Sequence, residues 1–159
     1  MNDINLFGKP VSDFIRINLK SEIEALHKKN VIPKLAAILV GDDPASTIYV
    51  NTKNRTFKKM KCESEVYSFP SNILQNDLIK HIDTLNKDNK VHGILIQLPL
   101  PNHIDTNKVL ESVDPSKDVD GFHPENLGYL FQGNPRFIPC TPFGCIEILK
   151  FYKIKTKSK

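Results

Sequence analysis

The chain has 159 residues, of which 40% are hydrophobic and 25% charged, proportions typical of one globular domain and unlike those of disordered or collagen-like chains. The net charge is +4, but the last ten residues hold five lysines and no acid, so the rest of the chain is close to neutral. No apolar run approaches the roughly 18 residues of a membrane span, and the amino terminus has no apolar signal segment. We therefore expect a cytoplasmic protein with no membrane partner.

The basic residues and the cysteines show which partners and which disulfide or metal sites the sequence disfavours. Only three of the 22 basic residues are arginines, whereas nucleic-acid surfaces favour arginine forks, so we expect no nucleic-acid partner and interpret the basic end as solvated. Cys62, Cys140 and Cys145 cannot form a disulfide framework, and they lack the paired spacing of a structural zinc site. We expect buried free thiols.

Helical and strand patterns alternate along the first half of the chain. Apolar residues at helical spacing predict an amphipathic helix over 11–29. The continuous apolar run over 35–40 is typical of a strand buried on both faces. A helix is then expected to open at Pro44, with Asp43 as its cap.

The second half continues the alternation. Patterns predict a strand over 64–69, a helix over 74–85 and a third strand over 93–98. Seven prolines between 99 and 142 indicate loops and short helices, and a last helix is expected over 142–152 with Thr141 as its cap. Because crossovers between parallel strands are right-handed, the sequence predicts an α/β fold of βαβ units, with a parallel-rich sheet flanked by helices.

One face of the helix that opens at Pro44 gathers side chains able to bind a ligand. Ser46, Tyr49 and Lys53 are spaced i, i+3 and i+7, which places a hydroxyl, an aromatic ring and an ammonium on the same face. Ligands of open α/β sheets bind beyond the carboxyl ends of the strands, and this helix follows such an end. The alternative is a half-buried aromatic side chain beside a solvated lysine.

Two later positions are also candidates. Gln97 ends an apolar strand, and a buried amide without partners costs about 1–3 kcal/mol, so either a ligand or the core must satisfy it. Asp120 can grip a planar, amidine-like edge with both carboxylate oxygens. The segment around it, DPSKDVDG over 114–121, lacks the ligand spacing of a calcium loop, and we expect no metal.

A nucleotide cofactor has no fingerprint in this sequence. No two of the seven glycines lie closer than five residues apart. The chain therefore has neither a G-x-G-x-x-G turn nor a Walker loop to cradle phosphates.

Four segments together resemble one family. They are VGDDPASTIYVNTK (40–53), GILIQLPLP (93–101), PSKDVDGFHPENLG (115–128) and PCTPFG (139–144). In content, order and spacing they are similar to the bifunctional methylenetetrahydrofolate dehydrogenase/methenyltetrahydrofolate cyclohydrolases, the FolD family. The resemblance covers the chain from about residue 6 to residue 155.

The resemblance implies a role for each candidate. By this resemblance Lys53 is the catalytic lysine and Gln97 is its partner. The Tyr49 ring lies against the folate, and Asp120 binds the edge of the pterin. The implied substrate-binding residues are Ser46, Tyr49, Leu98, Pro99 and Asp120. The bridging carbon of the methenyl substrate is a cationic amidinium, so its hydrolysis needs proton transfers that a neutral lysine can perform. Burial beside a cation lowers the pKa of a lysine.

The family also implies a reaction and a domain organisation. Its members interconvert 5,10-methylene-, 5,10-methenyl- and 10-formyltetrahydrofolate as NADP-dependent dehydrogenases and cyclohydrolases, and the full-length family forms homodimers. In full-length relatives an NADP-binding Rossmann domain follows the catalytic domain. We expect residues 1–150 to be the catalytic domain and 151–159 to be a basic tail where the second domain would begin.

From this organisation we expect the chain to lack the Rossmann domain and to bind no NADP. Its partners would be tetrahydrofolate derivatives, and its activity at most the cyclohydrolase step or folate binding. One alternative is a non-enzymatic, truncated remnant that acts as a binding or subunit-association module. Another is an unrelated nucleotide-binding α/β domain, which the missing phosphate loop disfavours.

Overall fold

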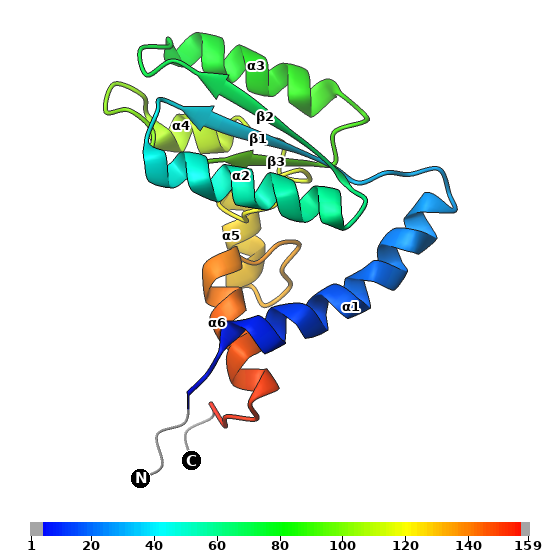
Figure 1. Cartoon of the computed structure of the whole chain (residues 1–159). Helices are drawn as coiled ribbons and strands as arrows, with labels where there is room; N and C mark the ends of the chain where they lie inside the picture. Colours follow the sequence, from blue (N-terminus) through cyan, green and yellow to red (C-terminus); the bar gives the residue numbers. More distant parts are fainter. Residues whose placement is uncertain (1–4, 157–159) are drawn as a thin grey trace.

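The computed structural model describes residues 5–156 of the chain (Figure 1). The elements follow in the order α1 Gly8–His27, β1 Lys34–Val40, α2 Pro44–Lys59, β2 Glu63–Phe69, α3 Gln75–Lys87, β3 Gly93–Ile96, α4 Thr106–Glu111, α5 Pro124–Phe131 and α6 Cys140–Phe151. Among the described residues no helix is long and apolar enough to cross a membrane.

The three strands form one parallel sheet in the order β2-β1-β3. Lys34 of β1 pairs with Glu63 of β2, and Leu35 pairs with Gly93 of β3. Because β1 has a strand on each edge and helices over each face, six of its seven residues are buried (Figure 1). The predicted α/β fold with a parallel sheet flanked by helices is confirmed.

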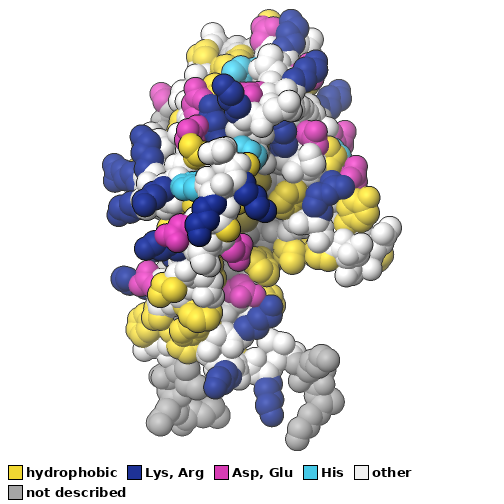
Figure 2. Space-filling view, turned by 90° about the vertical axis from the view of Figure 1, so that its right-hand side faces the viewer, with side chains coloured by type: hydrophobic (Ala, Val, Ile, Leu, Met, Phe, Trp, Pro, Cys, Tyr) yellow, Lys and Arg dark blue, Asp and Glu magenta, His cyan; other side chains and the backbone are white. Residues whose placement is uncertain are grey.

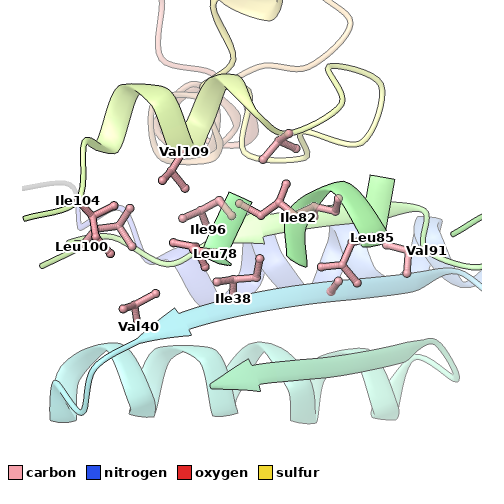
Figure 3. Close-up of a cluster of buried hydrophobic side chains, with 13 residues drawn as sticks. Ile38, Val40, Leu78, Ile82, Leu85, Val91, Ile96, Leu100, Ile104 and Val109 are labelled. Carbon is pink, nitrogen blue, oxygen red and sulfur yellow. The ribbon is translucent and has the colours of Figure 1, made fainter. Parts of the chain in front are cut away.

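Two apolar clusters hold the sheet between its helices. Successive side chains of a strand point to opposite faces, so Ile38 and Val40 face α3 and α4, whereas Leu35 and Ala37 face Val50 of α2. The cluster on the α3 and α4 side contains thirteen buried residues (Figure 3). This layered packing makes the sheet and its three helices the rigid part of the fold.

The start of α2 agrees with the predicted cap. The helix begins at Pro44, and the Asp43 carboxylate accepts a hydrogen bond from the backbone N–H of Ser46 at 2.7 Å. Proline suits this first position because the N–H that it lacks would have no partner within the helix. The cap fixes where the face carrying Tyr49 and Lys53 begins.

The start of α6 differs from the prediction. The helix begins at Cys140 with Pro139 as its N-cap, and Phe143 N–H donates to Pro139 O at 3.1 Å, so Thr141 lies inside the first turn. The first-turn N–H groups of a helix have no intrahelical partner, and Pro142 therefore fits there without ending the helix. The prediction of Thr141 as cap was wrong.

The prediction of three buried thiols was also wrong. Cys62 is buried, but Cys140 and Cys145 are exposed. Both belong to α6, and α6 buries none of its residues because it lies away from the sheet. The third strand is shorter than expected and ends at Ile96. Gln97 N–H still donates to Ile38 O at 2.9 Å, but Pro99 has no N–H with which to continue the ladder.

Candidate functional site

A cavity of about 370 Å³ lies between α2, the sheet and the segment that leads into α6. Tyr49, Lys53 and Asp120 line it together, although 67 residues separate the last two in the sequence. The remaining wall is mostly apolar, with Leu35, Phe57, Leu95 and Val119, and it also contains Lys34 and His92. It includes the amino-terminal ends of β1 and β3, so the expectation of a site beyond the carboxyl ends of the strands was wrong for this cavity. A flat, largely apolar ligand with one polar edge is complementary to such a wall.

The α2 side of the cavity carries an aromatic ring and an ammonium. Tyr49 and Lys53 are one helical turn apart, and the Lys53 Nζ lies 4.3 Å from the centroid of the Tyr49 ring. Such a cation–π contact orients the lysine and is worth about 0.5–2 kcal/mol, depending on its exposure. Tyr49 is still 54% exposed, so part of its ring is free for a ligand.

Burial and neighbouring charges shift the pKa values of Lys53, Asp120 and Cys140, which lie close together in the cavity. Burial lowers the pKa of Lys53, and the charge of Asp120 opposes that shift in part. Burial raises the pKa of Asp120, while Lys53 and a hydrogen bond with Cys140 oppose it. Partial burial of the thiol, followed by the neighbouring Asp120 carboxylate, raises the pKa of Cys140. Burial therefore favours the neutral form of Lys53, which suits a proton acceptor. The second lysine of the cavity, Lys34, behaves in the opposite way, because its hydrogen bond with Glu65 raises its pKa.

Two glycines allow the segment with Asp120 to approach the sheet and α6. A Cβ on Gly93 would lie 2.5 Å from Val119 Cγ1, which no side chain tolerates without movement. Gly121 has φ +69°, a left-handed conformation that favours glycine, and a Cβ there would lie 3.1 Å from Pro139 N. Both contacts flank Asp120 and bring its carboxylate to the cavity wall.

The other four candidate residues do not line this cavity. Ser46 is buried in the first turn of α2, where it bonds Asp43. Gln97 is partly buried, and its amide nitrogen donates to Leu98 O at 2.8 Å. Leu98 packs against the larger apolar cluster, and Pro99 is exposed. The catalytic role of Gln97 and the part of the other three in substrate binding stay predictions.

Of the residues that line the cavity, only Tyr49, Lys53 and Asp120 were candidates from the sequence; Phe57 and Cys140 are two of those that it missed. Phe57 lies one turn after Lys53, and its i+4 spacing was the available signal. Cys140 lies in the PCTPFG segment, but only the packing of 119–121 against Pro139 brings it to Asp120. Within residues 5–156 no group of three or more histidine, cysteine or acidic side chains is arranged to hold a metal ion.

Comparison with known proteins gives one consistent result. The family model for the tetrahydrofolate dehydrogenase/cyclohydrolase catalytic domain matches residues 6–120, which include Tyr49, Lys53 and Asp120. The bifunctional protein FolD of Nautilia profundicola is 51% identical over 154 residues, which are 97% of this chain and 54% of that protein. The one of Acetivibrio thermocellus is 53% identical over 145 residues, 91% of this chain and 51% of that protein.

Solved structures agree with these relatives. The bifunctional enzyme FolD of Campylobacter jejuni superposes with a TM-score of 0.93 at 48% identity, over 97% of this chain and 55% of that one. The enzyme of Trypanosoma brucei, described as complexed with NADP cofactor and inhibitor, gives 0.91 at 31% identity, over 96% of this chain and 52% of that one. The chain thus spans about half the length of the proteins that it matches.

Proposed function

Because this chain belongs to the tetrahydrofolate dehydrogenase/cyclohydrolase family, we propose that it binds a tetrahydrofolate derivative in the cavity beside α2 and serves one-carbon folate interconversion. The observation that carries the proposal is the meeting of Tyr49, Lys53 and Asp120 on one largely apolar cavity. The reaction that suits these groups is the hydrolysis of 5,10-methenyl- to 10-formyltetrahydrofolate.

The polar edge of the pterin suits Asp120. A pterin presents neighbouring N–H donors in one plane, and a carboxylate can accept two such bonds side by side. The exposed part of the Tyr49 ring provides a flat surface for the aromatic part of the ligand, and the apolar wall around Leu95 and Val119 excludes water. In the proposed pose the one-carbon bridge lies near Lys53.

Lys53 is the proposed proton carrier. Water adds to the cationic bridging carbon, and the neutral amine takes the proton that this water releases. The same proton then goes to the ring nitrogen as its bond to the bridging carbon breaks. The hydroxyl on that carbon releases its own proton to solvent and becomes the carbonyl of a formyl group on the other nitrogen. Burial supports this role because it lowers the pKa of Lys53. The family resemblance alone supports the remaining roles: Gln97 as the partner of Lys53, and Ser46, Leu98 and Pro99 as binding residues.

The described residues do not fit the phosphates of NADP. Dinucleotides bind where free backbone N–H groups of a glycine-rich turn open a helix. Here α2, α3 and α4 follow the three strands, and none of them begins on a glycine-rich turn. At α2 and α4 the Asp43 and Asp105 carboxylates also accept N–H groups of the first turn. We therefore derive no hydride-transfer step from this chain. We propose residues 1–150 as the folate-binding catalytic domain and 151–159 as a basic tail, of which 157–159 lie outside the described residues.

A second candidate function is subunit association without catalysis. It is favoured by α1, which leaves Phe14 54% and Ile17 72% exposed. Light scattering of the purified chain distinguishes the two candidate functions. An association module forms dimers or larger species, and Ile17→Ser weakens their assembly. A folate-binding domain binds its ligand whether or not the Ile17→Ser variant assembles.

The test of the main proposal is Lys53→Met. Because the proposed role of Lys53 is proton transfer, we expect the variant to lose hydrolysis of 5,10-methenyltetrahydrofolate, followed by absorbance, and to keep binding, followed by calorimetry. Lys58→Met is the matched control, since this exposed lysine lies on the same helix outside the cavity. A native chain that does not bind the folate, or a Lys53→Met chain that hydrolyses it at the parent rate, contradicts the proposal.

A further inference from the structure

Lys117 lies three residues before Asp120 and is bonded in an unusual way. Its Nζ donates to three backbone carbonyls at the end of α3: Leu85 O at 3.0 Å, Asn86 O at 2.7 Å and Asp88 O at 2.8 Å. A lysine ammonium has three donors, and all three are used here. The last carbonyls of a helix have no intrahelical partner and carry partial negative charge, so they are good acceptors for this cation.

The backbone around Lys117 is tied to the sheet as well. Its carbonyl accepts a hydrogen bond from Ile94 N–H of β3 at 2.7 Å, and Ile94 also forms a parallel bridge with Asp118. One residue therefore joins the C-terminal end of α3, the edge of β3 and the segment that leads to Asp120.

The chain after Asp120 is fixed by a second group of buried polar contacts. The Asp118 carboxylate accepts His123 N–H at 2.8 Å and the Asn126 amide at 2.9 Å. Asn126 is fully buried and also donates to Pro115 O at 2.9 Å. Asp120 thus lies between two anchored positions, and its side chain is the one in this segment that acts on Lys53.

We propose that Lys117 is a positioning residue, which holds the Asp120 carboxylate beside Lys53 by tying its segment to α3 and β3. The inference rests on the proposed function in taking these two residues as the site. Nothing in it requires Lys117 to touch a ligand, because Lys117 does not line the cavity. Loss of the three bonds frees the segment, and the carboxylate then moves away from the lysine.

The direction of one pKa change separates positioning from two simpler effects. The charge of Asp120 raises the pKa of Lys53, so a carboxylate that moves away lowers it. Removal of the positive charge of Lys117 acts in the opposite direction, because a lost like charge raises the pKa of Lys53. General loosening of the fold also raises it, since water then relieves the burial.

The experiment measures the pKa of Lys53 in the full chain by competitive labelling of lysine amines with acetic anhydride across pH, read by mass spectrometry. The variants are Lys117→Met, Asp120→Asn and the double variant. Gln75→Leu is the control, because Gln75 Oε1 accepts from Asp105 N–H and ties the opposite end of α3 to α4. No folate is present, so a failure of folate binding leaves this result unaffected.

We expect Lys117→Met to lower the pKa of Lys53 by a large part of the Asp120→Asn shift, and the double variant to match Asp120→Asn alone because the two changes act through one carboxylate. Gln75→Leu should leave it unchanged. If Lys117→Met does not fold, Lys117→Arg decides. Its guanidinium keeps the charge and has enough donors, but they lie in one rigid plane and cannot all point at the three carbonyls that the compact ammonium reaches. A smaller downward shift is then expected. An unchanged or raised pKa of Lys53 in the folded variant overturns the proposal, as does an additive double variant.

Discussion

The sheet with α2, α3 and α4 and the pair formed by α1 and α6 are held in different ways. The first region buries thirteen apolar residues in one cluster, whereas α1 buries only Val11 and α6 buries none of its residues. Hydrophobic side chains reach the surface in the lower half of the molecule (Figure 2), where Figure 1 places α1 and α6. Phe14 of α1 meets Phe151 of α6 edge to face, and just outside the two helices the Tyr152 hydroxyl donates to Phe7 O.

This difference bears on the candidate site. Segments with few buried side chains open at low free-energy cost, while a buried core opens only with the whole fold. Tyr49, Lys53 and Asp120 come from the sheet region, and only Cys140 comes from the first turn of α6. The groups proposed for proton transfer and pterin binding therefore lie on the stable region, at its boundary with the weakly packed one.

The largest expected effect is that of Ile38→Ala compared with Ile17→Ala. Ile38 is fully buried in the central strand, and its truncation should lower the free energy of unfolding by about 2–5 kcal/mol. Ile17 is 72% exposed on α1, and its truncation should change the same quantity by less than about 0.5 kcal/mol. Urea denaturation measures both. Equal losses would show that α1 is packed as firmly as the sheet.

A smaller effect is expected at the contact that brings the Asp120 segment to β3. Gly93→Ala places a Cβ 2.5 Å from Val119 Cγ1, and such overpacking costs about 1–3 kcal/mol of stability. The matched control is Gly128→Ala in α5, where no atom lies within 4 Å of the added Cβ and the helix gains from alanine. Thermal unfolding compares the two variants. A Gly93→Ala chain as stable as the Gly128→Ala chain would contradict the close approach.

The smallest expected effect is a pH dependence of stability that arises in the sheet region, at His81 of α3. Burial lowers the pKa of His81 below its ordinary 6.5, and within residues 5–156 its Nε2 has no hydrogen-bond partner. The folded chain thus binds the proton less readily than the unfolded chain does, so stability falls as pH drops below about 6.5. His81→Gln should reduce this loss between pH 7.5 and 5.5, followed by the urea midpoint. The same pH dependence in both chains would rule out His81 as its source.

Local patterns were enough to predict α2 and its site face. Asp43 and Pro44 mark the helix start, and helical spacing alone places Tyr49 near Lys53. Asp120 was a candidate from its own chemistry, but its place beside Lys53 depends on Gly93 and Gly121, which allow distant segments to touch. Such packing leaves no periodic signal in a sequence.

The misplaced elements have separate causes. The third strand was predicted through Leu98 because its apolar run continues, yet its pairing with β1 ends at Ile96 although β1 itself runs on to Val40. Pro99 has no N–H with which to continue the ladder. The burial of Cys140 and Cys145 was misjudged because α6 carries apolar residues but lies away from the sheet. Composition shows that a helix is apolar, and only the tertiary arrangement shows whether anything covers it.

Hydrogen exchange with and without a tetrahydrofolate derivative tests most directly whether the candidate site lies on the sheet region. Amide exchange of the full chain, followed by mass spectrometry, separates peptides of α2, of residues 114–122 and of α1. We predict that saturating 5,10-methenyltetrahydrofolate slows exchange around Tyr49, Lys53 and Asp120 and leaves α1 unchanged. Unchanged exchange in all three regions, or protection confined to α1, would contradict the site proposed here.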